Sequence, residues 1–174
     1  FGLPQVFNDF IGREKELADL EKNSGSVQVV THQLKKTDKH DLHSTQQVHG
    51  TGGIGKTQLI NHFTRLMLFR GFYKWAVWFR VGDGSEKRSE LIDSQIIDLA
   101  QRLGISVEKY KIQKLTELVL VTLNNFGKGV LVLDDVSDYN VIKIIMQLKN
   151  KLQNIDVIIT SRNSDVWSPE FKQI

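Results

Sequence analysis

The stretch VHGTGGIGKTQL, residues 48–59, decides how the chain is expected to fold. It holds four glycines within six residues, directly followed by a lysine and a threonine. Glycine lets the backbone adopt positive φ and approach a ligand closely, so that successive N–H groups can point toward one anion. Gly50, Gly55, Lys56 and Thr57 match the pattern G-x-x-x-x-G-K-[ST] at every position. This pattern predicts a polyphosphate-binding loop that leads into a helix.

Each part of such a loop has its own task. The backbone amides surround the phosphates, Lys56 is expected to reach the outer phosphates, and the hydroxyl of Thr57 is expected to bind Mg²⁺. The simpler interpretation, a flexible turn between two elements, stays open at this point. The predicted nucleotide-binding residues of the loop are Gly50, Thr51, Gly52, Gly53, Ile54, Gly55, Lys56, Thr57 and Gln58.

The elements around this loop alternate between two kinds. Short, almost wholly apolar runs are typical of strands covered on both faces, and the segments between them carry apolar residues at helical spacing. This alternation predicts a three-layer α/β domain with a parallel sheet. Strands are expected at 27–30, 45–49, 74–81, 130–133 and 155–160, helices at 59–67, 92–103, 115–126 and 141–148, a short solvent-facing helix at 14–22, and a polar surface loop at 32–44.

The composition limits the possible classes of protein. The 174 residues, 40% of them apolar, suit one domain, predicted to span 1–174. A net charge of +3 spread along the chain does not indicate a nucleic-acid surface. The chain has no cysteine and no apolar run near the roughly 20 residues that span a bilayer. We expect no membrane partner, a cytoplasmic location, and, since the sequence begins with Phe1, a piece of a larger protein.

Two carboxylates stand where the predicted phosphate site needs a metal partner. The run VLVLDDV, residues 130–136, ends an apolar strand with Asp134 and Asp135, and ligands bind at the carboxyl ends of such strands. Asp134 is therefore predicted to hold Mg²⁺, and Asp135 to polarise an attacking water. The alternative is that these residues only cap the next helix.

A basic residue follows the last predicted strand. Thr160 and Arg162 end the run IDVIITSRN at the same edge of the sheet, and an arginine there could stabilise a terminal phosphate. The alternative is a solvated surface arginine. Trp75 and Trp78 lie in a predicted buried strand, which favours core packing over stacking on nucleic-acid bases.

The order of these motifs resembles a known family. The runs FIGREKEL, GTGGIGKT, VWFRV, LVLDDV and VIITSRN are similar to those of the NB-ARC domain of STAND-type signalling ATPases. The resemblance implies that Asp134 is the magnesium aspartate, Asp135 the catalytic acid and Arg162 a sensor arginine. It also implies that the sensor strand lies between the glycine-loop strand and the Asp134 strand. The segment that would lie against adenine and ribose comprises Phe10, Ile11, Gly12 and Arg13.

The resemblance also implies a function. Such a domain would bind ATP or ADP with Mg²⁺ and act as a conformational switch that slow hydrolysis resets. Its partners would be the other domains of a larger protein and, in the ATP state, further copies of itself. Two alternatives stay open, a P-loop enzyme with steady turnover and an assembly module that holds nucleotide without hydrolysing it.

Overall fold

The structure is a computed structural model, and it describes residues 1–5, 13–22, 27–30, 55–81, 88–137, 139–149 and 152–161. Within this part of the chain lie four strands, five α-helices and one short 3₁₀ helix, η1 (Val107–Lys109). The predicted strand at 45–49 and the predicted loop at 32–44 fall outside these residues, so both stay predictions.

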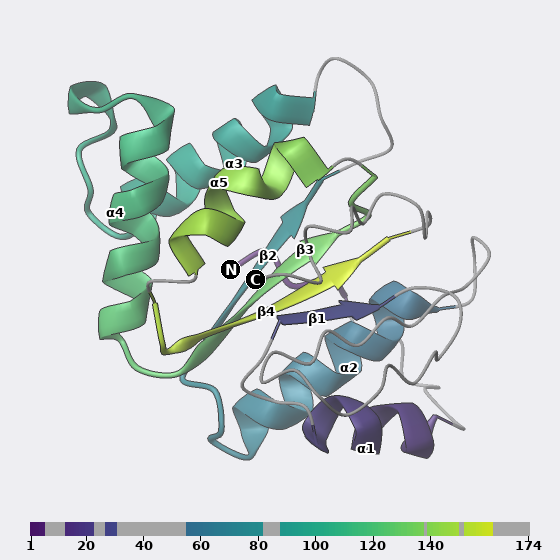
Figure 1. Cartoon of the computed structure of the whole chain (residues 1–174). Coiled ribbons are helices and arrows are strands. Elements are labelled where there is room, and N and C mark those ends of the chain that lie inside the picture. Colours follow the sequence, from purple (N-terminus) through teal and green to yellow (C-terminus); the bar gives the residue numbers. More distant parts are fainter. Residues whose placement is uncertain are drawn as a thin grey trace.

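The four strands form one parallel sheet (Figure 1). Its order is β1 (Val27–Val30), β4 (Ile155–Thr160), β3 (Gly129–Asp134) and β2 (Trp75–Arg80). Every residue of β3 and β4 is buried, as expected of strands whose two faces are both covered. The predicted placement of the last strand beside the aspartate strand is confirmed. Its other neighbour is β1, whereas the prediction puts the glycine-loop strand at 45–49 there, so this half of the predicted order is not confirmed.

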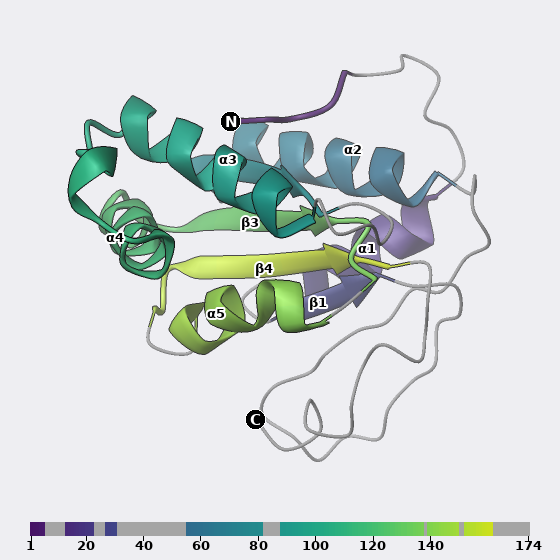
Figure 2. The ribbon, with the colours of Figure 1, turned by 90° about the horizontal axis from the view of Figure 1, so that it is seen from above.

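Helices cover both faces of the sheet, which makes the predicted three layers. α1 (Glu14–Lys22) and α2 (Lys56–Phe69) lie on one face. The other face carries α3 (Arg88–Arg102), α4 (Ile112–Asn125) and α5 (Tyr139–Lys149) (Figure 2). Each layer has its own apolar core, because alternate residues of a strand point to opposite faces. In β2, for example, Val77 and Phe79 join the core under α3, whereas Ala76 and Trp78 join the core under α2.

One prediction about α1 is wrong. The helix was expected to face solvent, but Leu20 is 1% exposed and belongs to the core between α2 and the sheet. Leu17 packs against the same core. The sequence misleads here because only a narrow apolar stripe of this charged helix is needed to attach it to α2.

The outer edge of β2 is hydrogen-bonded to the main chain of Phe1 and to the side chain of Gln95. The backbone nitrogen of Phe1 donates a hydrogen bond to the carbonyl of Ala76, and the carbonyl of Phe1 accepts one from the amide of Trp78, both at 2.9 Å. Further along the edge, the side-chain amide of Gln95 accepts from the Arg80 amide and donates to the Arg80 carbonyl, at 3.0 and 2.9 Å. An uncovered edge strand would be open to pairing with another chain.

Among the helices that the structure describes, none is both long and apolar enough to cross a membrane.

Candidate functional site

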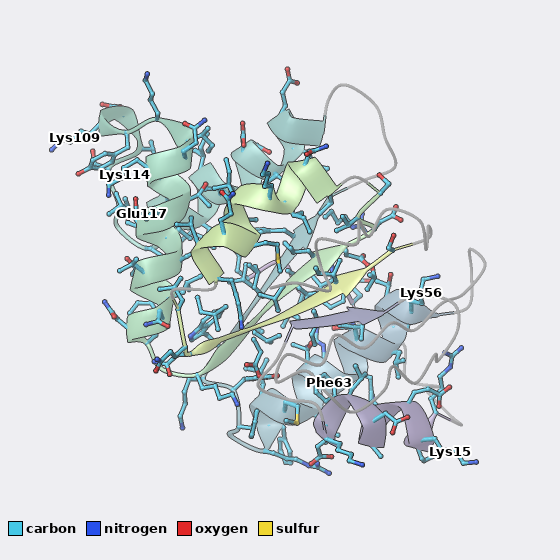
Figure 3. All side chains as sticks on the ribbon, in the orientation of Figure 1. Lys15, Lys56, Phe63, Lys109, Lys114 and Glu117 are labelled. Atoms are coloured by element: carbon cyan, nitrogen blue, oxygen red, sulfur yellow. The ribbon has the colours of Figure 1, made fainter. Side chains whose placement is uncertain are left out.

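The candidate site lies at the end of the sheet where β3 and β4 finish and α2 begins. Gly55 stands at the N-cap of α2 with φ 77°, a left-handed conformation that favours glycine. Among the described residues, no side chain caps the helix there, and a Cβ added at Gly55 would meet none of their atoms within 4 Å. The first turn of α2 therefore offers its amides and its positive dipole end to an anion. Figure 3 shows Lys56 at this beginning of α2, beside the end to which the strands run.

The hydroxyl of Thr57 connects the helix to the sheet. Its Oγ1 donates to Asp134, lying 3.1 Å from Oδ1 and 3.4 Å from Oδ2. The two residues are 77 positions apart in sequence. Asp134 ends β3 and is only 5% exposed, so its carboxylate is held among protein atoms instead of being solvated. The structure thus brings together the two side chains that the sequence predicts as magnesium ligands.

A second hydroxyl bonds to the same carboxylate. Thr160, the last residue of β4, donates its Oγ1 to Asp134 Oδ1 at 2.5 Å. The Oγ1 of Thr160 also accepts a hydrogen bond from the backbone amide of Asp135, at 2.8 Å. Asp135 is half-buried and has φ 63°, a conformation that non-glycine residues seldom adopt, although aspartate tolerates it better than most. The sequence predicts Thr160 at this edge of the sheet but does not predict these two hydrogen bonds.

The other predicted residues differ in how far the structure places them. Gln58 lies in the first turn of α2 and is half-buried. Arg13 directly precedes α1, and its carbonyl accepts from the amide of Leu17 at 3.0 Å. The remaining predicted residues fall outside the described part of the chain: Phe10, Ile11, Gly12, Gly50, Thr51, Gly52, Gly53, Ile54 and Arg162.

The oxygen atoms of Thr57 and Asp134 suit magnesium, which needs few protein ligands, better than a metal ion bound by protein side chains alone. In the portion of the chain that the structure describes, no group of three His, Asp or Glu side chains could hold a metal ion. Magnesium keeps several waters and is usually bound through one or two carboxylates together with substrate phosphates. One hydroxyl and one carboxylate beside the start of a helix, as Thr57 and Asp134 provide, fit that requirement.

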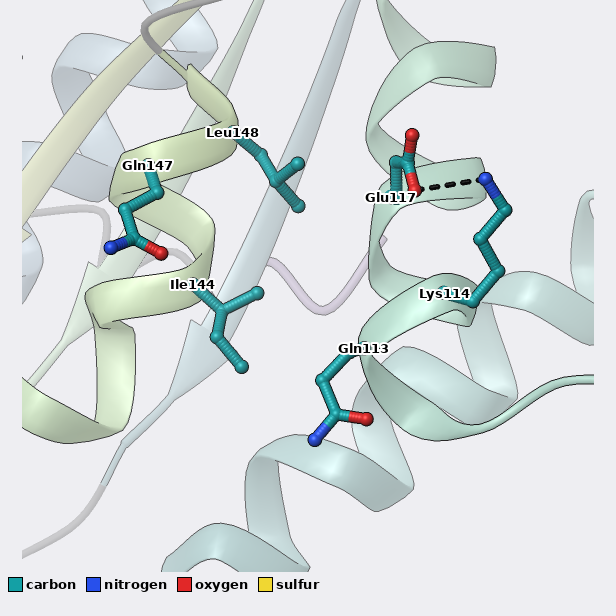
Figure 4. Close-up of a pocket in the computed structure, with 6 residues that line it drawn as sticks. All are labelled: Gln113, Lys114, Glu117, Ile144, Gln147 and Leu148. Carbon is teal, nitrogen blue, oxygen red and sulfur yellow. Dashed lines mark hydrogen bonds and ion pairs between the residues drawn. The ribbon is translucent and has the colours of Figure 1, made fainter.

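An open hollow of about 590 Å³ lies elsewhere, between α4 and α5 (Figure 4). An exposed ion pair between Lys114 and Glu117, 2.9 Å long, stands on its α4 side. Exposed ion pairs of this kind are ordinary surface features, and the hollow brings together none of the predicted site residues. It is lined by Gln113, Lys114, Glu117, Ile144, Gln147 and Leu148.

Comparisons with known proteins agree with this fold. The sequence model described as the NB-ARC domain matches residues 23–172. Among solved structures, the chain is similar to the ORC2 protein of Aeropyrum pernix, determined as ADPNP and ADP complexes, with a TM-score of 0.58 and 13% identity. The similarity covers 98% of this chain but 46% of that one, so this chain spans about half the length of the ORC2 protein. A search of curated proteins finds no match.

Proposed function

Because the chain belongs to the NB-ARC family, we propose that it binds ADP or ATP with Mg²⁺ and serves as a conformational switch reset by slow hydrolysis. The bond between Thr57 and Asp134 is the observation that carries this proposal. In P-loop proteins, the hydroxyl residue after the lysine and an acidic residue at a strand end share one magnesium ion. Folding brings these two residues of the present chain, far apart in sequence, into hydrogen-bond contact.

The phosphates would be bound by the loop and by the start of α2. Residues 50–58 would supply backbone amides, and Lys56 would place its positive charge against the outer phosphates. Phe10, Ile11, Gly12 and Arg13 would lie against adenine and ribose. Bound Mg²⁺ would neutralise part of the phosphate charge.

The hydrolytic step would depend on residues at the strand ends. Thr57 would be a direct magnesium ligand and Asp134 would act through a metal-bound water. Asp135 would orient the attacking water and accept its proton, while Arg162 would stabilise charge on the terminal phosphate.

The switch would be read by a larger protein. We propose that other domains of the parent protein respond to the bound nucleotide, that the ATP state associates with further copies, and that the protein acts in the cytoplasm. The ORC2 protein was determined with ADPNP and ADP, which supports adenine nucleotides as the ligand class for this related fold.

The decisive experiment measures bound nucleotide and turnover together. The full-length protein is purified, denatured, and its released nucleotide identified by chromatography, and steady-state hydrolysis of ATP is measured in parallel. A switch predicts copurified ADP and a turnover below about one per minute, far under the typical enzyme value of about 10 s⁻¹. Sustained fast turnover would instead support a P-loop enzyme, and bound ATP that stays intact would support an assembly module.

A further inference from the structure

We infer that Thr160 is a positioning residue that fixes the carboxylate of Asp134 and the backbone of Asp135 at the same time. The inference deepens the proposed function and rests on it for the metal. Thr160 is 3% exposed and ends β4, the strand next to the one that carries both aspartates. Its side chain is thus a fixed, buried hydroxyl and not a solvated one.

A single hydroxyl can serve both aspartates because it offers one donor and two acceptor lone pairs. The Oγ1 of Thr160 uses the donor on Asp134 Oδ1 and one lone pair on the Asp135 amide. The carbonyl of Thr160 also accepts from the amide of Val136 at 2.8 Å. Three consecutive residues, the last of β3 and the two that follow it, are therefore bonded to one residue of β4.

The first consequence concerns which oxygen of Asp134 faces the metal. Oδ1 accepts from both Thr57 and Thr160, whereas the described residues place only the longer 3.4 Å contact from Thr57 at Oδ2. Short O–H···O⁻ bonds are charge-assisted and directional, so they fix the plane of the carboxylate. Oδ2 is then the oxygen with acceptor capacity left for a metal-bound water.

The second consequence concerns the direction in which the chain leaves β3. At φ 63° the backbone of Asp135 is in a conformation that must be held by its surroundings. The Thr160 hydroxyl holds it by accepting the Asp135 amide. Loss of that hydroxyl would release the aspartate proposed to orient water together with the aspartate proposed to hold the metal.

The test compares Thr160→Val, which keeps the shape but removes the hydroxyl, with Thr160→Ser, which keeps the hydroxyl. Thr116→Val is the matched control, because Thr116 is also buried and, among the described residues, its hydroxyl bonds within α4, to the carbonyl of Ile112 at 2.8 Å. Mn²⁺ is titrated into each full-length protein with bound ADP and followed by electron paramagnetic resonance. Thr160→Val should weaken Mn²⁺ affinity by roughly 10- to 100-fold, the usual effect of losing an outer-shell partner of a metal ligand. Thr160→Ser and Thr116→Val should leave it within about threefold, since each keeps the Asp134 contact.

A second measurement needs no ligand. Hydrogen exchange of the Asp135 amide, followed by NMR in the nucleotide-free protein, should speed up about tenfold in Thr160→Val and stay unchanged in Thr160→Ser, because one hydrogen bond is lost. Thermal unfolding establishes that each variant is folded, and Thr160→Cys, whose thiol is a weak donor, replaces Thr160→Val if the latter does not fold.

The outcomes separate the two proposals. Lower thermal stability of Thr160→Val with unchanged Mn²⁺ affinity would make Thr160 a purely structural residue and overturn the inference. Unchanged exchange of the Asp135 amide would overturn it as well, even if the unsubstituted protein binds no nucleotide. A third outcome is that the unsubstituted protein binds no nucleotide while the Asp135 amide exchanges faster in Thr160→Val. That result would overturn the proposed function and the metal role of Thr160. It would support only the part of the inference in which Thr160 holds the backbone of Asp135.

Discussion

At the scale of single residues, the two aspartates of the site are unusual, one in its backbone conformation and the other in its burial. Asp135 is left-handed, and Asp134 is almost fully buried although it carries a carboxylate. Buried charges need partners, and the hydroxyls of Thr57 and Thr160 supply them. Hydrogen bonds to these two hydroxyls therefore hold the side chain of Asp134, and the Thr160 hydroxyl also holds the backbone of Asp135.

Replacement of Lys56 should remove nucleotide binding. Lys56→Ala is expected to weaken ADP binding by roughly 100-fold or more, because charge-assisted bonds to phosphate are about twice as strong as neutral ones. Isothermal titration calorimetry measures the affinity. Lys114→Ala is the control, since Lys114 forms only an exposed ion pair with Glu117 on α4. Equal affinities of the two variants would contradict the phosphate role of Lys56.

Replacement of Asp135 should separate binding from hydrolysis. Asp135→Asn keeps a residue that tolerates the left-handed conformation but removes the carboxylate. We expect ATP affinity to be retained and turnover to fall by about 100-fold, the lower range for loss of a general base. Single-turnover hydrolysis measures this, with Asp98→Asn on the exposed face of α3 as control. A turnover equal to that of the unsubstituted protein would mean that Asp135 is not the base.

At the scale of elements, the start of α2 is the feature with the clearest consequence. The helix begins without a side-chain cap because Gly55 turns the chain through a left-handed residue. An asparagine or serine cap would occupy the amides that the proposed phosphate needs. The uncapped start thus gives up some local stability in favour of anion binding.

This feature can be tested with two matched glycines. Gly55 and Gly104 have φ 77° and 74°, and a Cβ added at either meets no atom of the described residues within 4 Å. Gly55→Ala and Gly104→Ala should therefore both lower the free energy of unfolding by about 1 kcal/mol, from backbone strain alone. Urea unfolding measures the stability and calorimetry the ADP affinity. Only Gly55→Ala should weaken ADP binding, so a similar loss of affinity in Gly104→Ala would refute the special role of Gly55.

At the scale of the whole molecule, the two ends of the sheet have different tasks. One end gathers the proposed nucleotide site. At the other end, near the start of β4, the buried carboxylate of Asp156 accepts from the hydroxyl of Tyr73 at 2.9 Å, and Lys128 lies 3.7 Å away. These three residues connect the turn after α2 to β4 and to the residue just before β3, at the opposite end of the sheet from Asp134.

Loss of the Tyr73 hydroxyl should therefore change stability without changing binding. Tyr73→Phe is expected to lower the free energy of unfolding by about 1.5–3 kcal/mol, the usual value for a hydrogen bond to a charged group. Calorimetry should give an ADP affinity equal to that of the unsubstituted protein. Altered affinity in the folded variant would show that the two ends of the sheet are coupled.

Much of this architecture could be predicted from sequence, for a physical reason. Buried parallel strands are continuous apolar runs, so β2, β3 and β4 were located almost to their ends, and helical spacing located α2 to α5. The glycine-loop motif predicts that Thr57 and Asp134 meet, but long-range pairs of polar atoms outside a known motif could not be predicted. The role of Thr160 depends on the register that pairs Leu133 with Ile159, and the bond between Tyr73 and Asp156 joins residues 83 positions apart. The structure alone supplies those distances.

The strand order has a consequence for how the protein is made. β4 is the last strand that the structure describes, yet it lies between β1 and β3 and is the strand with which β1 pairs. In a chain emerging from the ribosome, β2 can pair with β3 early. β1 has no such partner until β4, which ends at Thr160, has been synthesised. Unpaired strand edges of incomplete chains favour aggregation, so nascent chains should need chaperone protection until β4 has emerged.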